Sequence, residues 1–337
     1  MSIKPLQDYL FQQVKEKLPK NVQLVDAVAD LLHLSNDSAY RRIRGETPLV
    51  LDELQLLCNT YGISLDHLLQ TRSNTASFNV MRVNNRDHDF GKYWTDLLQT
   101  LQWVASHQYK QIIYMTKDMP FIYNFSFRPI FAFRHFFWMK SILQHPDYVH
   151  RTFSIDCLPP EIEALGTQIL KVYNDIPSIE LWNTESFNSS LAQIDYYHDA
   201  GYFASDADAH MLYDSMLQLM QHMQLQAEWG CKFLPGENPA TRPTNHSFYY
   251  NRVVLGDNTI VILTDDVKTL YINYDVLDYM VTQDEELCNN MYGKLQNLMR
   301  RSTLISSSSE RQRHHFFNLL YQKIPKPFNK LYNEMLS

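Results

Sequence analysis

Apolar residues recur at intervals of three and four through the first seventy residues, which is the spacing of helices that bury one face. Leu6, Leu10, Val14 and Leu18 mark the first such face. We therefore expect a small all-helical domain at 1–70. Its helices are expected at about 5–18, 22–32, 36–44, 51–61 and 65–69.

The third of these helices is short, and residue types mark its two ends. Ser35 is a natural N-cap, and Gly45 is a natural stop. Ala39 and Ile43 lie four positions apart and are expected to face inward, where the small Ala39 lets the helix lie close to the second one. Paired helices joined by a tight turn are the arrangement that places one helix in the DNA major groove.

The outward face of the third helix carries side chains of the kinds that bind DNA. Arginine binds guanine edges or phosphates, asparagine binds adenine, and tyrosine and serine bind phosphates. Asp37 is expected either to accept from a cytosine amino group or to orient Arg41, one turn further on. The predicted contacts to bases and phosphates are Asn36, Asp37, Tyr40, Arg41 and Arg44, with Ser35, Ser38 and Arg42 at the rim.

Residues 5–70 resemble the Cro/repressor-like, or XRE, helix-turn-helix family. The resemblance rests on Ala29, the Leu34-Ser35 turn and the segments 40–45 and 62–69. It implies a lambda-repressor-like DNA-binding domain of five helices. The chain departs from the family at Ile43, where a glutamate usually precedes the Arg-Gly pair.

The charge of this region is unusual for a DNA-binding domain. Residues 1–70 hold seven basic and nine acidic side chains, a net charge of −2, and the whole chain has a net charge of −7. The positive charge must then be localised on one face. One copy alone should bind DNA weakly, so dimerisation is expected. The alternative is an adaptor that uses the same helices to bind proteins.

A polar stretch at 71–79 is expected to be a linker, and 80–337 to form a mixed α/β domain, which makes the chain a multidomain α+β protein. Apolar runs at 247–255, 259–264 and 269–274 predict an antiparallel meander, followed by a return to helix at Tyr279. Other strands are expected at 111–115 and 179–182, and helices at 93–106, 131–143, 189–197, 207–225, 285–301 and 310–323. A capping box formed by Ser307 and Glu310 should start the last helix.

The whole chain is similar to a Bacteroidetes-type group of transcriptional regulators with an uncharacterised C-terminal domain. This similarity rests on the segments 136–140, 179–183 and 302–306. The strand-then-helix ending alone resembles a degenerate phospholipase-D-like sensor fold. Neither resemblance implies a ligand or a catalytic residue.

Three features of 80–337 allow two interpretations each. The aromatic block at 121–138 could line an apolar effector pocket, but a core strip or dimer surface is the commoner use of such residues. Asp206, His210 and Asp214 have the spacing of one helical face, which suits a metal ion or, more simply, an exposed acidic face. The segment 300–330 has seven basic residues against one acidic, and an exposed face is favoured over a second DNA contact.

No signature of catalysis, phosphate binding or membrane insertion is present. Cys157 and His198 stand in no nucleophile motif, the four cysteines form no CxxC pair, and the apolar stretch at 121–139 is interrupted by charged residues. We therefore expect no catalytic residue, no metal, no cofactor and no membrane partner, and a cytoplasmic location.

These observations predict a sequence-specific DNA-binding transcriptional regulator, and not an enzyme. Its expected partners are double-stranded DNA and a second copy of the chain, joined through 80–337. A small-molecule effector is a further partner that this layout admits. The rivals are the adaptor described above and an enzyme with an appended regulatory domain.

Overall fold

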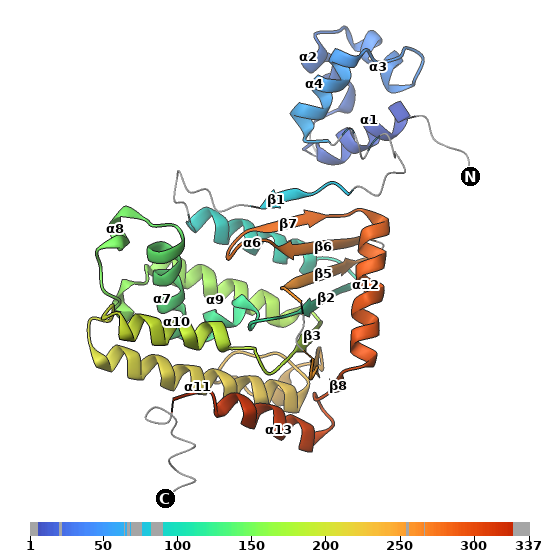
Figure 1. Ribbon diagram of the computed structural model, residues 1–337. Coiled ribbons are helices and arrows are strands. Elements are labelled where there is room, and N and C mark those ends of the chain that lie inside the picture. Colours follow the sequence, from blue (N-terminus) through green and yellow to red (C-terminus); the bar gives the residue numbers. More distant parts are fainter. Residues whose placement is uncertain are drawn as a thin grey trace, which may run out of the picture. The chain divides into compact units, whose positions relative to one another are not determined.

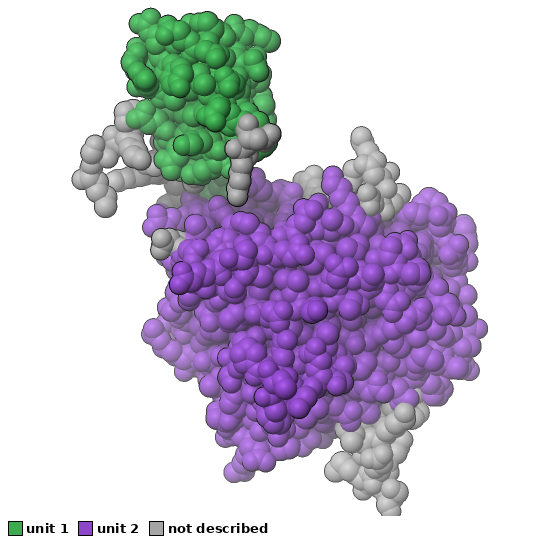
Figure 2. Space-filling model, turned by 180° about the vertical axis from the view of Figure 1, so that it is seen from behind, with its two compact units in different colours: residues 1–77 green, residues 78–337 purple. Residues whose placement is uncertain are grey.

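The computed structural model describes residues 6–19, 22–63, 65, 68, 76–81, 90–253, 256–265 and 267–325. The chain folds as two compact units, residues 1–77 and 78–337, which we call the helical unit and the sheet unit (Figure 2). A helical region is followed by a mixed α/β region whose sheet is mainly antiparallel, which confirms the expected fold class. None of the described helices combines the length and the apolar character that crossing a membrane requires.

The helical unit packs four described helices around one small core. They are α1 (Leu6–Lys17), α2 (Leu24–Leu32), α3 (Asn36–Ile43) and α4 (Leu51–Tyr61). Each helix contributes side chains from its predicted apolar stripe, such as Val14, Val28, Ala39 and Leu57. The fifth predicted helix, at 65–69, lies largely outside the described residues.

The sheet unit is built on a mixed sheet of eight strands in the order β1-β7-β6-β5-β2-β3-β4-β8. The strands are β1 (Asn79–Met81), β2 (Lys110–Met115), β3 (Ser178–Trp182), β4 (His246–Tyr250), β5 (Thr259–Thr264), β6 (Val267–Asn273), β7 (Tyr279–Thr282) and β8 (Thr303–Leu304). β2, β3 and β4 are mutually parallel neighbours, and every other pairing is antiparallel. The first strand, β1, begins inside the segment expected to be a linker.

Helices cover both faces of this sheet (Figure 1). The helices are α6 (Phe90–Ala105), α7 (Arg128–Phe137), α8 (Pro146–Val149), α9 (Pro160–Asp175), α10 (Asn188–Asp199), α11 (Asp206–Trp229), α12 (Glu285–Arg300) and α13 (Glu310–Tyr321). Alternate strand residues divide between two cores, because successive side chains of a strand point to opposite faces. Ile112 and Trp182 join the large aromatic core, whereas Ile113 and Leu181 pack with Leu295 of α12.

The predicted meander is wrong in its first strand. β4 does not lie beside β5, because β2 and β3 stand between them. β4 instead follows the crossover helix α11 and pairs in parallel with β3. The true meander is β5-β6-β7, one strand later in the chain. Closeness in sequence favours antiparallel neighbours, but a helical crossover makes parallel ones.

Three local predictions also need correction. Tyr279, expected to be helical, lies in β7, where it pairs with Asn273. Ser307 does not cap α13, since the N-cap position is Ser309, in a left-handed conformation and without a side-chain cap. The helix predicted at 131–143 is α-helical only to Phe137 and continues as a π-helical turn to Ile142.

Candidate nucleic-acid interface

The turn between α2 and α3 follows from its local sequence. α2 ends at His33, which adopts a left-handed conformation with φ of 54°, and the Leu34 N–H donates to the Ala29 carbonyl at 2.9 Å. This bond satisfies one of the carbonyls that a helix end leaves free. Ser35 then caps α3 as predicted, accepting from the Ser38 N–H at 3.3 Å. Ala39 is fully buried at the contact with the other helices.

Two arginines stand on the exposed side of α3 and its C-terminal end. The side chains of Arg41 and Arg44 are 61% and 66% exposed. Each has a guanidinium nitrogen 3.8 Å from Glu46, a distance at the long limit of an ion pair. Arg44 also lies over the ring of the half-exposed Tyr40, 5.5 Å from its centroid. Pairs this exposed contribute little to stability, so a phosphate can replace Glu46 at small cost.

Arg42 has a different environment, although it is a neighbour of Arg41 in sequence. Its guanidinium donates to both carboxylate oxygens of Glu53 in α4, at 3.0 and 2.8 Å, and the two side chains are only 17% and 15% exposed. The hydrogen bond from Arg42 lowers the pKa of Glu53, as does a further bond from the Val50 N–H. This forked pair joins α3 to α4 and fixes the orientation of α3.

The other predicted contact residues lie at the N-terminal end of α3. Asn36 donates to Asp26 of α2 at 3.1 Å, and Ser35 and Ser38 share a hydroxyl contact of 3.0 Å. Asp37 is exposed and forms no ion pair with Arg41 among the described residues, where Glu46 takes that place. The alternative in which Asp37 orients Arg41 therefore finds no support in this geometry.

Gln7 of α1 holds the loop that follows α3. Its amide nitrogen donates to the carbonyls of Arg42 and Thr47, at 2.6 and 2.8 Å, and its oxygen accepts from the Leu49 N–H at 3.2 Å. One side chain thus bonds three backbone groups of this segment, and the Arg42 carbonyl also accepts from the Gly45 N–H at 2.9 Å. Glu46 and the two arginines that it contacts are thereby placed on an anchored loop.

Sequence reasoning missed four residues of this site: Gln7, Asp26, Glu46 and Glu53. Glu53 alone left a usable signal, since a glutamate three residues after a helix start often accepts from the first backbone N–H. Gln7 and Asp26 act across helices, at separations of 35 residues or more for Gln7 with the Arg42 and Thr47 carbonyls and of 10 residues for Asp26 with Asn36. Glu46 lies on the loop that follows α3. Apolar periodicity carries no information about such contacts.

The residues of the sheet unit that were candidates for metal binding or catalysis lie in α10, in α11 and in the 3₁₀ turn at 155–157. Asp206 and Asp208 stand in the first turn of α11, capped by Ser205. Within the described residues no three His, Cys, Asp or Glu side chains are grouped so as to hold a metal ion. Burial raises the pKa of Cys157 to about 11, which is the opposite of what a reactive thiol needs. Most of the aromatic block, including Phe131 and Phe136, is core.

The basic segment at 300–330 does not act as one surface. Arg313 is buried and donates to the carbonyls of Ile305 and Ser308, both at 3.0 Å. Lys323 donates to Asn188 of α10. Arg300, Arg301 and Arg311 are exposed, whereas 326–337 lie outside the described residues. At least two of its charges therefore hold the sheet unit together.

Comparison with known proteins gives one match, which covers most of the helical unit and the first residues of the sheet unit. Residues 12–90 match the model of the BetR domain, a DNA-binding domain of helix-turn-helix type. The match includes α2, α3, α4 and β1. No curated protein and no solved structure gives a significant match to the chain. The match indicates a DNA-binding regulatory role for the matched segment, and the positions described above show which side chains of that segment are exposed.

Proposed function

We propose that the protein is a sequence-specific transcriptional regulator of XRE type that places α3 in the DNA major groove. The observation that carries the proposal is the exposure of Arg41 and Arg44 within the matched segment. Both side chains are exposed, and each lies 3.8 Å from the same exposed carboxylate, that of Glu46. On DNA these two arginines bind phosphates or guanine edges. Tyr40, Asn36 and Asp37 lie beside them on the exposed side of the helix.

Arg42, Ser35 and Ser38 take supporting roles in this proposal. Arg42 positions α3 through Glu53, and the two serines cap the helix start, where its N–H groups face the backbone of the DNA. The proposal assigns the chain no catalytic step.

The sheet unit is proposed to join two chains and to respond to a small effector. The acidic helical unit needs two copies on adjacent half-sites to reach useful affinity, because each copy neutralises few phosphates. Two half-sites one helical turn apart would then form an inverted repeat.

The test is selection of DNA fragments from the organism's own genome by the purified full chain, at two salt concentrations. The proposal expects a short inverted repeat, recovered less well at the higher salt. Arg41→Ala with Arg44→Ala should weaken binding to that repeat by about thirtyfold or more, since each contact contributes at least about 1 kcal/mol.

The matched control removes the same charge elsewhere. Lys171 of α9 and Lys294 of α12 are both exposed, and their double alanine variant should bind the repeat like the wild type. Binding that is equally weak in both double variants would reflect net charge and contradict the role of α3. Absence of any selected sequence would favour the adaptor, whose activity needs neither arginine.

A further inference from the structure

Three loops of the sheet unit meet at one end of the sheet, where β2 ends. Met115 at the end of β2 pairs with Thr259, and Thr259 pairs with Ile272 near the end of β6. The segments 116–119, 256–258 and 274–278 therefore lie together. β2 is also the strand at which parallel pairing, to β3, changes to antiparallel pairing, to β5. Ligands of α/β sheets bind beyond the carboxyl ends of parallel strands, where the topology changes.

A pocket of about 500 Å³ lies at this end, within the size range of small-molecule sites. Its polar wall includes Lys117 and Asp118 after β2, Asn124 and Arg134 near α7, and Ser189 and Gln193 of α10. Its apolar wall includes Phe121, Trp138 and Leu277.

The polar wall is held rigid by its own hydrogen bonds. Arg134 is buried and donates to Asn124 at 3.2 Å, to Ser190 and to Gln193. A fourth neighbour, Asp118, lies 3.7 Å away, and its own position is fixed by accepting from the Phe187 N–H at 3.0 Å. Side chains fixed in this way form a preorganised wall that a ligand need not order.

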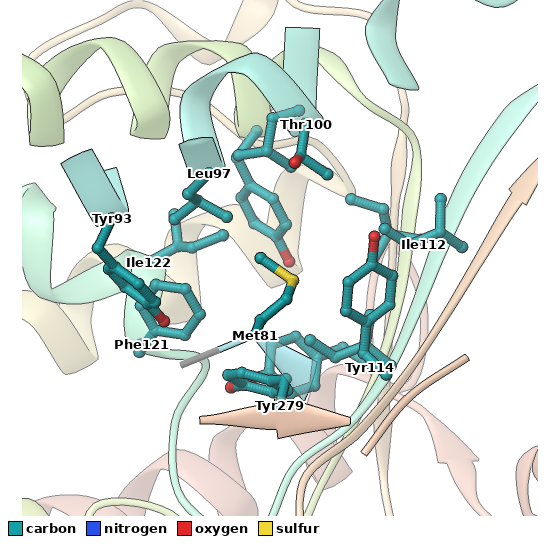
Figure 3. Close-up of a pocket in the computed structure, with 14 residues that line it drawn as sticks. Met81, Tyr93, Leu97, Thr100, Ile112, Tyr114, Phe121, Ile122 and Tyr279 are labelled. Atoms are coloured by element: carbon teal, nitrogen blue, oxygen red, sulfur yellow. The ribbon is translucent and has the colours of Figure 1, made fainter. Parts of the chain in front are cut away.

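A smaller, apolar pocket adjoins the first one. The two pockets share Tyr93, Tyr114, Phe121 and Tyr279 as wall residues. Only about 60 Å³ of the apolar pocket is free, and Figure 3 shows the side chain of Met81 extending into its middle, between Tyr93, Tyr114 and Tyr279. Methionine is flexible and fills gaps without a fixed shape, so it is easily displaced.

Tyr114, in the wall of both pockets, has a buried hydroxyl that lacks a hydrogen bond of good geometry. The residue is 1% exposed, and within the described part of the chain its hydroxyl has no partner at full hydrogen-bond geometry, although the neighbouring Tyr279 hydroxyl interacts with it and helps burial to raise the Tyr114 pKa. Buried tyrosine hydroxyls usually find one, because leaving the group unsatisfied is costly. An oxygen atom of a ligand at the junction of the two pockets would accept this bond.

The charges around the larger pocket argue against an anionic ligand. Lys117 already pairs with Asp257 at 3.2 Å, and Arg134 lies beside Asp118. Asp275 adds a further carboxylate to the wall. An additional negative charge would meet three carboxylates and two cations that are already paired.

We propose that the two pockets form one site for an uncharged small molecule with an apolar ring at one end and a carbonyl or hydroxyl oxygen at the other. The ring takes the place of the Met81 side chain, and the oxygen accepts from the Tyr114 hydroxyl.

Binding at this site would act on the strand that follows the helical unit in the chain. Among the described residues β1 spans three positions and pairs with β7, with Met81 opposite Tyr279. It also lies within the segment matched by the BetR domain. Displacing Met81 weakens β1 pairing and so changes the attachment of the DNA-binding unit. This coupling rests on the proposed function, whereas the binding site does not.

The test compares three probes of similar shape on the full chain: acetophenone, ethylbenzene and benzoate. Binding is followed by the ¹³C-methyl NMR signal of Met81, which the Met81→Leu variant identifies. Acetophenone should shift this signal saturably and bind more tightly than either of the others. No saturable shift with any of the three, or tightest binding of benzoate, would overturn the proposal.

Variants locate the site. Tyr114→Phe should weaken acetophenone binding by about five- to tenfold, the value of one hydrogen bond, and leave ethylbenzene unchanged. Tyr249→Phe is the control, since Tyr249 packs against the core on the α12 side of the sheet. Leu97→Phe, which fills the apolar pocket, should abolish binding of both probes. Equal effects of Tyr114→Phe and Tyr249→Phe would contradict the role of Tyr114.

A DNA arm separates this inference from the proposed function. Acetophenone is added to the complex of the chain with its selected repeat, and DNA affinity is measured. DNA binding without any Met81 shift would overturn the site and leave the regulator standing. A saturable Met81 shift in a chain that selects no DNA would support the site and overturn the regulator.

Discussion

The two units use charged residues in opposite ways. In the helical unit Arg41 and Arg44 lie at the surface and share the exposed Glu46. In the sheet unit Glu180 and Lys232 are completely buried. Exposed pairs are weak and exchange partners, whereas buried groups must keep theirs. The comparison teaches that an arginine or a carboxylate indicates function only when its environment leaves it able to change partner.

The buried group around Glu180 shows what the sheet unit needs from its charges. Glu180 accepts from Tyr123 and Tyr173 at 2.6 and 2.7 Å and from Trp182 at 2.9 Å. Burial alone would raise the pKa of Glu180, but His246, Lys232 and the Tyr123 bond lower it to about 2. Burial lowers the pKa of Lys232 to about 7, and the attraction of Glu180 opposes that change.

The largest effect is expected from Glu180→Gln, which should destabilise the sheet unit by about 3–5 kcal/mol, because it leaves Lys232 buried without its counter-charge. Unfolding in urea followed by tryptophan fluorescence measures this unit alone, since all five tryptophans lie in 78–337. Glu310→Gln, at a 77% exposed side chain, is the control and should have little effect. A loss below about 1 kcal/mol would show that the buried charge is not needed.

The next effect is a loss of stability in mild acid that is confined to the sheet unit. Burial lowers the pKa of His135 and of His222 to about 4, from an ordinary value of 6.5. Between these values the unfolded chain binds more protons than the folded one, so stability falls as the pH is lowered from 6.5 to 4. Each histidine accounts for about 3 kcal/mol. His222→Gln should remove about half of this pH dependence, and an unchanged profile would contradict the assignment.

A smaller effect is expected at Arg42. Like the charged groups inside the sheet unit, its side chain is largely enclosed and is paired with a carboxylate, that of Glu53. Arg42→Gln should destabilise the helical unit by about 2 kcal/mol, the value of hydrogen bonds between charged groups. Far-UV circular dichroism of the full chain measures it, and the tryptophan transition should not move. Adding Glu53→Gln should cost little more, because both variants remove the same pair. Loss of DNA binding while the unit is still folded would place Arg42 on the DNA instead.

The smallest effect concerns Glu46, the residue that competes with DNA for Arg41 and Arg44. Glu46→Gln should tighten DNA binding by about two- to fivefold, because an exposed pair contributes less than about 1 kcal/mol. The helical content of the Glu46→Gln variant should equal that of the wild type. Weaker binding in this variant would mean that Glu46 orients the arginines rather than competing for them.

The sequence predicted local structure well where one residue type decides it. Apolar spacing, the Ser35 cap and the glycine after α3 predicted helices at 22–32 and 36–44, and the structure has α2 at 24–32 and α3 at 36–43. The helix at 160–175 was not predicted, and the partner of β4 was predicted wrongly. The pairing of β4 depends on a contact across the whole of α11, and apolar periodicity contains no information about it.

The contact residues on α3 stay a prediction, and the sequence did not predict the carboxylates that pair with them. The sequence placed Arg42 at the rim and Arg41 and Arg44 among the contacts, but only the fold shows that Arg42 is largely enclosed by its pair with Glu53 while Arg41 and Arg44 are exposed. The carboxylates that make this difference lie on the following loop and helix. The Arg134 wall was likewise hidden, because Asn124, Asp118 and Gln193 come from three separate elements.

The central claim is that Arg41 and Arg44 carry the contact with DNA. It is tested most directly by the salt dependence of binding to the selected repeat, for the full chain and for the variant with both residues changed to alanine. The account predicts a shallower slope of log affinity against log salt in the variant, by about 2 for each chain bound, since each lost phosphate contact removes about 1. An unchanged slope and affinity would contradict it.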